Sequence, residues 1–125
     1  MIIAVAVLGC VILGALAVFQ ALLVVGKPLG RFAWGGQHTV LPRNLRVGSA
    51  ISIVLYAAMV VLLLCAAGAL DVLPGGFVDV AIWVLAGYFA LGILLNGISR
   101  SRPERLVMTP VVSVLAVVSL VLALQ

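Results

Sequence analysis

The sequence contains very little charge. Only 8% of its 125 residues are charged, with three acidic side chains in all, whereas 66% are hydrophobic. Soluble domains carry about 25% charged residues, and small ones bury only about 60–70% of the surface that the unfolded chain exposes. A chain of this composition cannot hide its apolar surface from water. A soluble enzyme, a disordered chain and a disulfide-stapled secreted domain are therefore excluded.

Residues that carry chemistry are also scarce. Cys10 and Cys65 fall within apolar runs, which favours packing over a disulfide or a metal pair, and the only histidine, His38, has no partner for a metal site. The sequence has no phosphate-binding loop and no nucleophile with a credible base. We predict no enzyme activity, no metal and no cofactor; the remaining catalytic alternative is Glu104 with His38 and the arginines. No basic folded face for nucleic acid is expected.

Four long apolar runs are what the sequence does contain, at 2–25, 47–70, 76–98 and 106–124. Each is close to the roughly 20 residues that a helix needs to cross about 30 Å of hydrocarbon, and none alternates as barrel strands do. In lipid, backbone groups must be satisfied within each segment. The sequence predicts an all-α, polytopic membrane protein: one domain, 1–125, with four transmembrane helices in a compact bundle. The fourth helix is expected over 104–124, and the loops at 26–46 and 99–103.

The basic residues predict the orientation. All seven lie in these two loops or at their edges: Lys27, Arg31, Arg43, Arg46, Arg100, Arg102 and Arg105. The turn between the second and third spans carries only Asp71 and Asp79. The positive-inside rule places both basic loops in the cytoplasm and both termini outside, with the loops against anionic lipid headgroups. No ionisable side chain lies in the middle of a span, which disfavours a proton-coupled transporter.

The start of the fourth helix resembles a capping box. In Ser101-Arg102-Pro103-Glu104, Ser101 is the expected N-cap and Glu104 follows three residues later, as a capping carboxylate or, alternatively, a functional acid. Pro103 is tolerated in the first turn. Pro110 is expected to kink the helix and free a carbonyl near Leu106, which Thr109 or Ser113 helps to satisfy.

Small and polar residues at helical spacing predict the inward faces of the bundle. The predicted stripes are Cys10, Gly14, Ala17 and Ala21; Ser49, Ser52 and Tyr56; Tyr88, Gly92, Asn96 and Ser99; and Thr109, Ser113 and Ala116. At 1.5 Å per residue, most polar side chains fall in the cytoplasmic half. This depth predicts a polar vestibule open to the cytoplasm, formed by Gln20, Ser52, Tyr56, Tyr88 and Thr109. The alternative is that these groups only bond across helices.

The first loop is rich in glycine and proline, with Phe32 and Trp34 suited to the headgroup level. We expect it to lie on the mouth of the bundle. Glu104 is the only acid on that side, so an arginine of the loop or His38 is expected to approach it, while Asn96 orients the loop by hydrogen bonds. The candidate ligand or partner site consists of Trp34, Gln37, His38, Arg43, Asn96, Ser99, Glu104 and Arg105.

The run from Pro28 to Gly36, followed by Val40-Leu41-Pro42, resembles a motif of an uncharacterised family of small four-helix bacterial membrane proteins. A later Asn-x-x-Ser-x-Ser-x-x-Glu-Arg segment of that family is matched by Asn96, Ser99, Ser101, Glu104 and Arg105. The resemblance implies a four-helix fold in the bacterial cytoplasmic membrane, and no activity.

Two functions of different class remain open. The first is an accessory or interaction subunit that packs against a larger membrane protein. The second is a homo-oligomeric module that binds or transports a small solute or lipid in the vestibule. Both need the lipid bilayer; the first also needs a membrane protein partner, and the second needs self-association.

Overall fold

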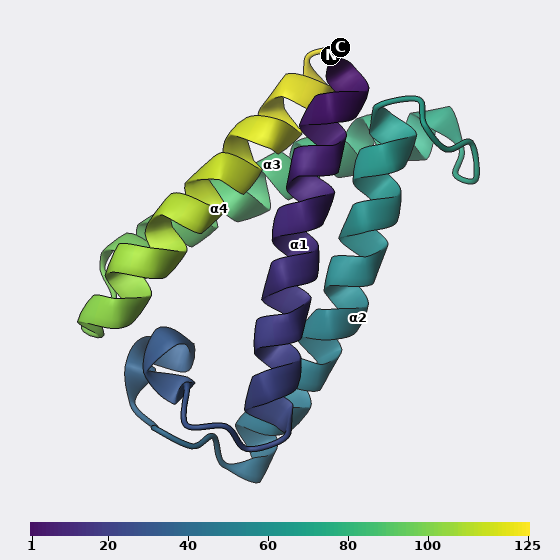
Figure 1. Ribbon diagram of the computed structural model, residues 1–125. Helices are drawn as coiled ribbons and strands as arrows, with labels where there is room; N and C mark the ends of the chain where they lie inside the picture. Colours follow the sequence, from purple (N-terminus) through teal and green to yellow (C-terminus); the bar gives the residue numbers. More distant parts are fainter.

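The chain folds into four long helices with no strands, in a computed structural model that describes residues 1–125 (Figure 1). The elements are α1 (Ile2–Val24), the short turns η1 (Gly30–Phe32) and η2 (Trp34–Gly36), α2 (Arg43–Ala66), α3 (Gly75–Gly97) and α4 (Arg102–Ala123). Each long helix has 22 to 24 residues and is apolar enough to cross a membrane. The predicted all-α fold is confirmed, and the protein is a multi-pass membrane protein.

The helix bounds differ most from the apolar runs in α2. This helix begins at Arg43, directly after Pro42, whose backbone is extended (φ −68°, ψ 165°). Its first turn is polar, so hydropathy alone does not mark where it begins. It ends at Ala66, close to Gly68, whose φ of +80° cannot continue a right-handed helix. In α4, Ser101 is the N-cap and Pro103 lies in the first turn, as predicted.

The four helices form two antiparallel hairpins that cross each other. The most extensive contacts join α1 to α2 and α3 to α4. Figure 1 shows the hairpins meeting near the chain termini and diverging toward the opposite end, where the segment between α1 and α2 folds back. We call these the termini end and the loop end. The loop end comprises residues 25–42 and 98–101 with the adjoining helix ends.

The hydrophobic core lies where the hairpins cross. It includes Leu13, Leu63 and Leu115, each at most 1% exposed. Gly9 allows the close approach of α1 to α2 and α4, because a Cβ at this position would lie 2.8 Å from Leu63 Cδ1 and 3.0 Å from Val118 Cγ1. Only 20 of the 125 residues are buried. Many large apolar side chains are therefore exposed, as expected for helices surrounded by lipid.

Two of the predicted inward stripes are only partly right: Cys10 packs against the core and Gly92 against Val112 of α4, but other members of these stripes are exposed. On α1, Gly14 and Ala21 are exposed, and the buried face carries Gly9 and Gln20 instead. On α3, Tyr88 is 55% exposed, while the buried residues are Val78, Ile82, Leu85, Ala86 and Phe89. Crossed hairpins leave space between helices, and large side chains fill that space where small ones would leave it empty.

The α4 helix is continuous through Pro110. The hydroxyl of Ser113 donates to the carbonyl of Thr109 at 2.7 Å, while the buried Thr109 hydroxyl has no hydrogen-bond partner. Neither side chain satisfies the carbonyl near Leu106, so that expectation is wrong. Both cysteines are free, consistent with their predicted packing role, and Cys10 Sγ lies 3.9 Å from the Val60 carbonyl oxygen.

Candidate functional site

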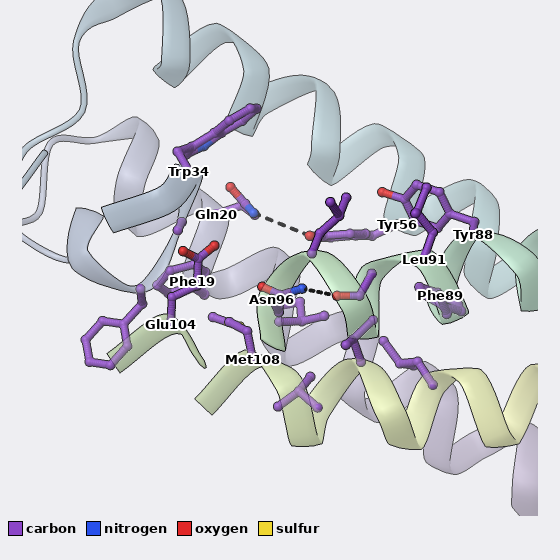
Figure 2. A pocket seen from close by; sticks show the side chains of 18 residues that line it. Phe19, Gln20, Trp34, Tyr56, Tyr88, Phe89, Leu91, Asn96, Glu104 and Met108 are labelled. Atoms are coloured by element: carbon purple, nitrogen blue, oxygen red, sulfur yellow. Dashed lines mark hydrogen bonds between the residues drawn. The ribbon is translucent and has the colours of Figure 1, made fainter. Parts of the chain in front are cut away.

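A cavity of about 260 Å³ lies between the hairpins at the loop end (Figure 2). All four helices and the loop contribute to it. Its lining residues are Leu16, Phe19, Gln20, Phe32, Ala33, Trp34, Tyr56, Tyr88, Phe89, Leu91, Gly92, Leu95, Asn96, Glu104, Met108, Val111, Val112 and Leu115. Fourteen of these 18 residues are hydrophobic. Apolar walls with a few placed polar groups are typical of sites for small molecules.

Gln20 is the buried polar residue of α1 at this cavity. Its side chain is only 8% exposed, and its Nε2 donates to the hydroxyl of Tyr56 on α2 at 3.3 Å. The Oε1 atom accepts no hydrogen bond. An unpaired buried acceptor costs roughly 1–3 kcal/mol. Because the atom is buried, this unpaired acceptor lies within the wall of the cavity and not on its accessible surface.

Glu104 lies in the first turn of α4 and is only 9% exposed. Ser99 Oγ donates to Glu104 Oε2 at 2.6 Å, and the same Ser99 oxygen accepts the N–H of Ser101 at 3.2 Å. Arg105 Nη1 donates to the Ser99 carbonyl at 3.0 Å. Ser99 thus holds the carboxylate, and the other Glu104 oxygen accepts no hydrogen bond from the chain.

The prediction of a capping box is wrong for the side-chain hydrogen bonds of this segment. Ser101 is the N-cap residue, but its side chain makes no capping hydrogen bond. Its hydroxyl donates to the carbonyl of Arg31 in η1. Glu104 meets Ser99 and does not reach back to the Ser101 N–H. The cause is tertiary, because the folded-back loop offers Ser101 a carbonyl acceptor that a solvated helix end would lack.

Trp34 positions the loop over the cavity. Its indole Nε1 donates to Ser49 Oγ on α2 at 3.1 Å, and Ser49 is fully buried. The ring packs on Gly48, where a Cβ would lie 2.8 Å from Trp34 Cη2. Trp34 adopts a positive φ of 52°, a conformation that costs a non-glycine residue about 1–2 kcal/mol. The indole hydrogen bond and this packing offset that cost.

The loop closes on itself and on α4. The Gly30 N–H donates to the Thr39 carbonyl at 2.8 Å. Gly36, with φ +71°, lies against Ser101 so closely that a Cβ would overlap the serine side chain. The loop is therefore attached to α2 through Trp34 and to α4 through Gly36 and Arg31. It lies over the mouth between the hairpins, as predicted.

The structure brings together only part of the predicted site. Trp34, Asn96 and Glu104 line the cavity with Gln20, Tyr56 and Tyr88, and Ser99 and Arg105 adjoin it through the contacts of Glu104. Gln37, His38 and Arg43 are exposed and lie outside the lining. Ser52 and Thr109 also lie outside it, and the Ser52 hydroxyl donates to Gly48 of its own helix at 3.0 Å.

Two expected contacts of the loop are absent. No loop cation binds Glu104: the Arg31 guanidinium lies 5.1 Å from the centroid of the Phe32 ring, and Arg46 Nε donates to the Leu41 carbonyl at 2.9 Å. Asn96 Nδ2 donates to Gly92 of its own helix at 2.8 Å and does not orient the loop. The loop is held by an indole, a hydroxyl and close backbone contacts.

Comparison of the sequence with protein-family models found no match, and comparisons with curated proteins and with solved structures found none either. The assignment of function therefore depends on the cavity and its surroundings.

Proposed function

We propose that this protein is a membrane-embedded binding module that holds a small, mostly apolar molecule in the loop-end cavity. The observation that carries the proposal is the cavity itself, with apolar walls from both hairpins and a few polar groups near the loop. An apolar cavity of about 150 Å³ is large enough to bind benzene. A cavity of about 260 Å³ therefore suits a molecule of one or two rings, or a short lipid fragment. Transport by a homo-oligomer is an extension of the same role.

We further propose that the loop end faces the cytoplasm of a bacterial cell and that both termini lie outside. The support is the charge distribution, because all seven basic residues lie at the loop end and two of the three acids, Asp71 and Asp79, lie at the other. The resemblance of the loop to bacterial four-helix proteins supports the same location. In this orientation the ligand enters from the cytoplasmic leaflet.

Photolabelling tests the binding role. The purified protein in lipid nanodiscs is labelled with a phenyl diazirine, and the labelled residues are mapped by mass spectrometry with and without excess unreactive phenethyl alcohol. We expect labelling at Met108 and Tyr56 that the competitor suppresses. Labelling at lipid-facing positions that the competitor leaves unchanged serves as the background. Labelling of the cavity that cannot be competed would refute the proposal.

A matched pair of variants on α3 sharpens the test. Leu91 lines the cavity and is 53% exposed, whereas Leu94 is 58% exposed and lies outside the lining. Leu91→Phe should weaken competition severalfold because the larger ring enters the cavity, and Leu94→Phe should leave it unchanged. Equal effects would show that labelling reports the lipid surface alone.

A second candidate function is that of an accessory subunit. Its support is a shallow apolar groove of about 430 Å³ on the outer side of the α3/α4 hairpin, lined by small residues such as Gly87, Ala90 and Ala116. Small residues allow transmembrane helices to approach closely. Cross-linking in native membranes from Ala90→Cys should give a discrete adduct, with a larger membrane protein or a second copy. Val80→Cys, exposed on α3 outside the groove, should give none.

A further inference from the structure

The charge and hydrogen-bonding capacity of the loop-end cavity point to one class of ligand. We infer that the cavity binds a small organic cation, a protonated amine attached to an apolar body. This inference rests on the proposed binding function and adds the chemistry of the ligand. It follows from three properties of the lining: its single formal charge, the unpaired acceptor atoms of Glu104 and Asn96, and its aromatic rings.

Glu104 is the only charged residue in the lining, and the guanidinium of the adjoining Arg105 donates to the Ser99 carbonyl and not to Glu104. Its side chain is nine-tenths buried, and only one carboxylate oxygen is held, by the hydroxyl of Ser99. A negative charge beside apolar walls interacts more strongly with a cation than it would in water, because the local dielectric is lower. It repels anions by the same mechanism. The charge of the lining therefore favours a cation.

The lining carries free donors as well as free acceptors, because the hydroxyl groups of Tyr56 and Tyr88 donate no hydrogen bond. The indole N–H of Trp34 and the amide donors of Asn96 and Gln20 are directed at partners on the helices. The Asn96 Oδ1 and the second carboxylate oxygen of Glu104 accept no hydrogen bond. Figure 2 shows Gln20, Asn96 and Glu104 around the same space, below Trp34. An ammonium group can donate both to the free Glu104 oxygen and to Asn96 Oδ1.

Aromatic side chains complete the cavity. Phe19, Phe32, Trp34 and Tyr88 are among the lining residues, and the faces of such rings attract cations. The Arg31 guanidinium already lies over the Phe32 ring, so the rings that remain for a ligand cation are those of Phe19, Trp34 and Tyr88. The apolar remainder of the cavity receives the body of the ligand.

The test uses three probes of matched shape and different charge: phenethylamine, phenethyl alcohol and phenylacetate at neutral pH. Their binding is followed by the fluorescence of Trp34 in a Trp83→Phe background, because Trp83 lies outside the cavity. The protein is held in phosphatidylcholine nanodiscs, and empty nanodiscs correct for partition into lipid. We expect the amine to bind at least tenfold more tightly than the alcohol, and phenylacetate more weakly than both, since hydrogen bonds to charged groups are the stronger ones.

Glu104→Gln retains the shape of the side chain and removes its charge. This variant should lose the preference for the amine, with a loss of affinity of at least tenfold, while its affinity for the alcohol stays the same. Asp79→Asn removes a carboxylate from the termini end. It should change neither the preference for the amine nor the affinity for the alcohol. If Glu104→Gln does not fold, the ratio of the amine and alcohol affinities of the unsubstituted protein tests the inference by itself.

The outcomes separate this inference from the proposed function. Equal affinity for amine and alcohol, together with competable diazirine labelling, would overturn the cation inference and leave the binding function standing. Tighter binding of phenylacetate would overturn it as well. If no probe binds and diazirine labelling cannot be competed, the proposed binding function and the inference both fail.

Discussion

Substitution of Gly36 by alanine should detach the loop from the start of α4. Gly36 has φ +71° and lies against the side chain of Ser101, whose hydroxyl donates to the Arg31 carbonyl. Gly35, its neighbour, has φ +78° but open space where a Cβ would lie. The two glycines therefore share a left-handed backbone and differ in their surroundings. This pair isolates the effect of the close contact.

The magnitudes follow from that geometry. Alanine in a left-handed conformation costs about 1–2 kcal/mol, and both variants incur this cost. Only Gly36→Ala adds an overlap with Ser101, and overpacking of this kind costs about 1–3 kcal/mol more. The free energy that holds the loop closed should therefore fall further in Gly36→Ala. Each 1.4 kcal/mol is a factor of ten in an equilibrium constant, so the two variants should differ by about one to two orders of magnitude in loop opening.

Amide hydrogen exchange measures this opening directly, because it reports local as well as global unfolding. The amide of Gly30, which donates to the Thr39 carbonyl, is the reporter for the loop, and amides in the middle of α1 are the control for the helices. We expect faster exchange of the loop in Gly36→Ala than in Gly35→Ala, with helix exchange unchanged. Equal loop exchange in the two variants would refute the proposed attachment of the loop to α4.

Three further predictions concern the core, the loop and the orientation. Gly9→Ala should lower the free energy of unfolding in mixed micelles by about 1–3 kcal/mol through overpacking of the hairpin crossing, whereas Gly14→Ala, with open space around its Cβ, should be neutral or slightly stabilising. Trp34→Phe removes the indole hydrogen bond to α2 and should cost about 0.5–1.5 kcal/mol in the same assay; an unchanged midpoint would show that this bond contributes nothing. A cysteine introduced beside Asp71 should be labelled by an impermeant maleimide added outside the cell, and a cysteine beside Arg43 only by one that reaches the inner face. The reverse pattern would contradict the proposed orientation.

The four helices could be predicted from hydropathy because lipid imposes both a length and a hydrogen-bonding requirement on each span. The inward faces could not, because helices that are apolar on all sides carry no periodic signal. Gly9 and Gly14 illustrate the difficulty. Both are small residues of α1, yet Gly9 lies at the hairpin crossing and Gly14 faces outward. The crossing of the hairpins, which sequence reasoning lacked, decides between them.

The sequence predicts how deep the site residues lie in the membrane, but not which way they face around the helix axis. The rise of the helix predicts Gln20 and Asn96 at the depth of the vestibule and Tyr56 deeper, near the midplane, and all three line the cavity. The same reasoning included Thr109, which lies outside the lining. The apolar walls, such as Met108, were missed because nothing in their sequence context distinguishes them from lipid-facing residues.

The capping of α4 shows a second limit. Local spacing correctly placed the N-cap at Ser101, because that preference depends on neighbouring residues. The partner of the Ser101 hydroxyl is Arg31, 70 positions away in the chain. A contact over such a separation depends on the path of the loop, and no local pattern in the sequence contains it.

The two chain termini lie close together in Figure 1, and Ile2 and Ala123 pack against the same core cluster. With four spans, both ends emerge on the same side of the bilayer, so a short linker can join them without crossing lipid. A new opening in residues 67–74, between the hairpins, then yields a circular permutant in which α3 and α4 precede α1 and α2. Each hairpin keeps its direction of insertion in that permutant. We therefore expect the same fold whichever of the two hairpins is synthesised first.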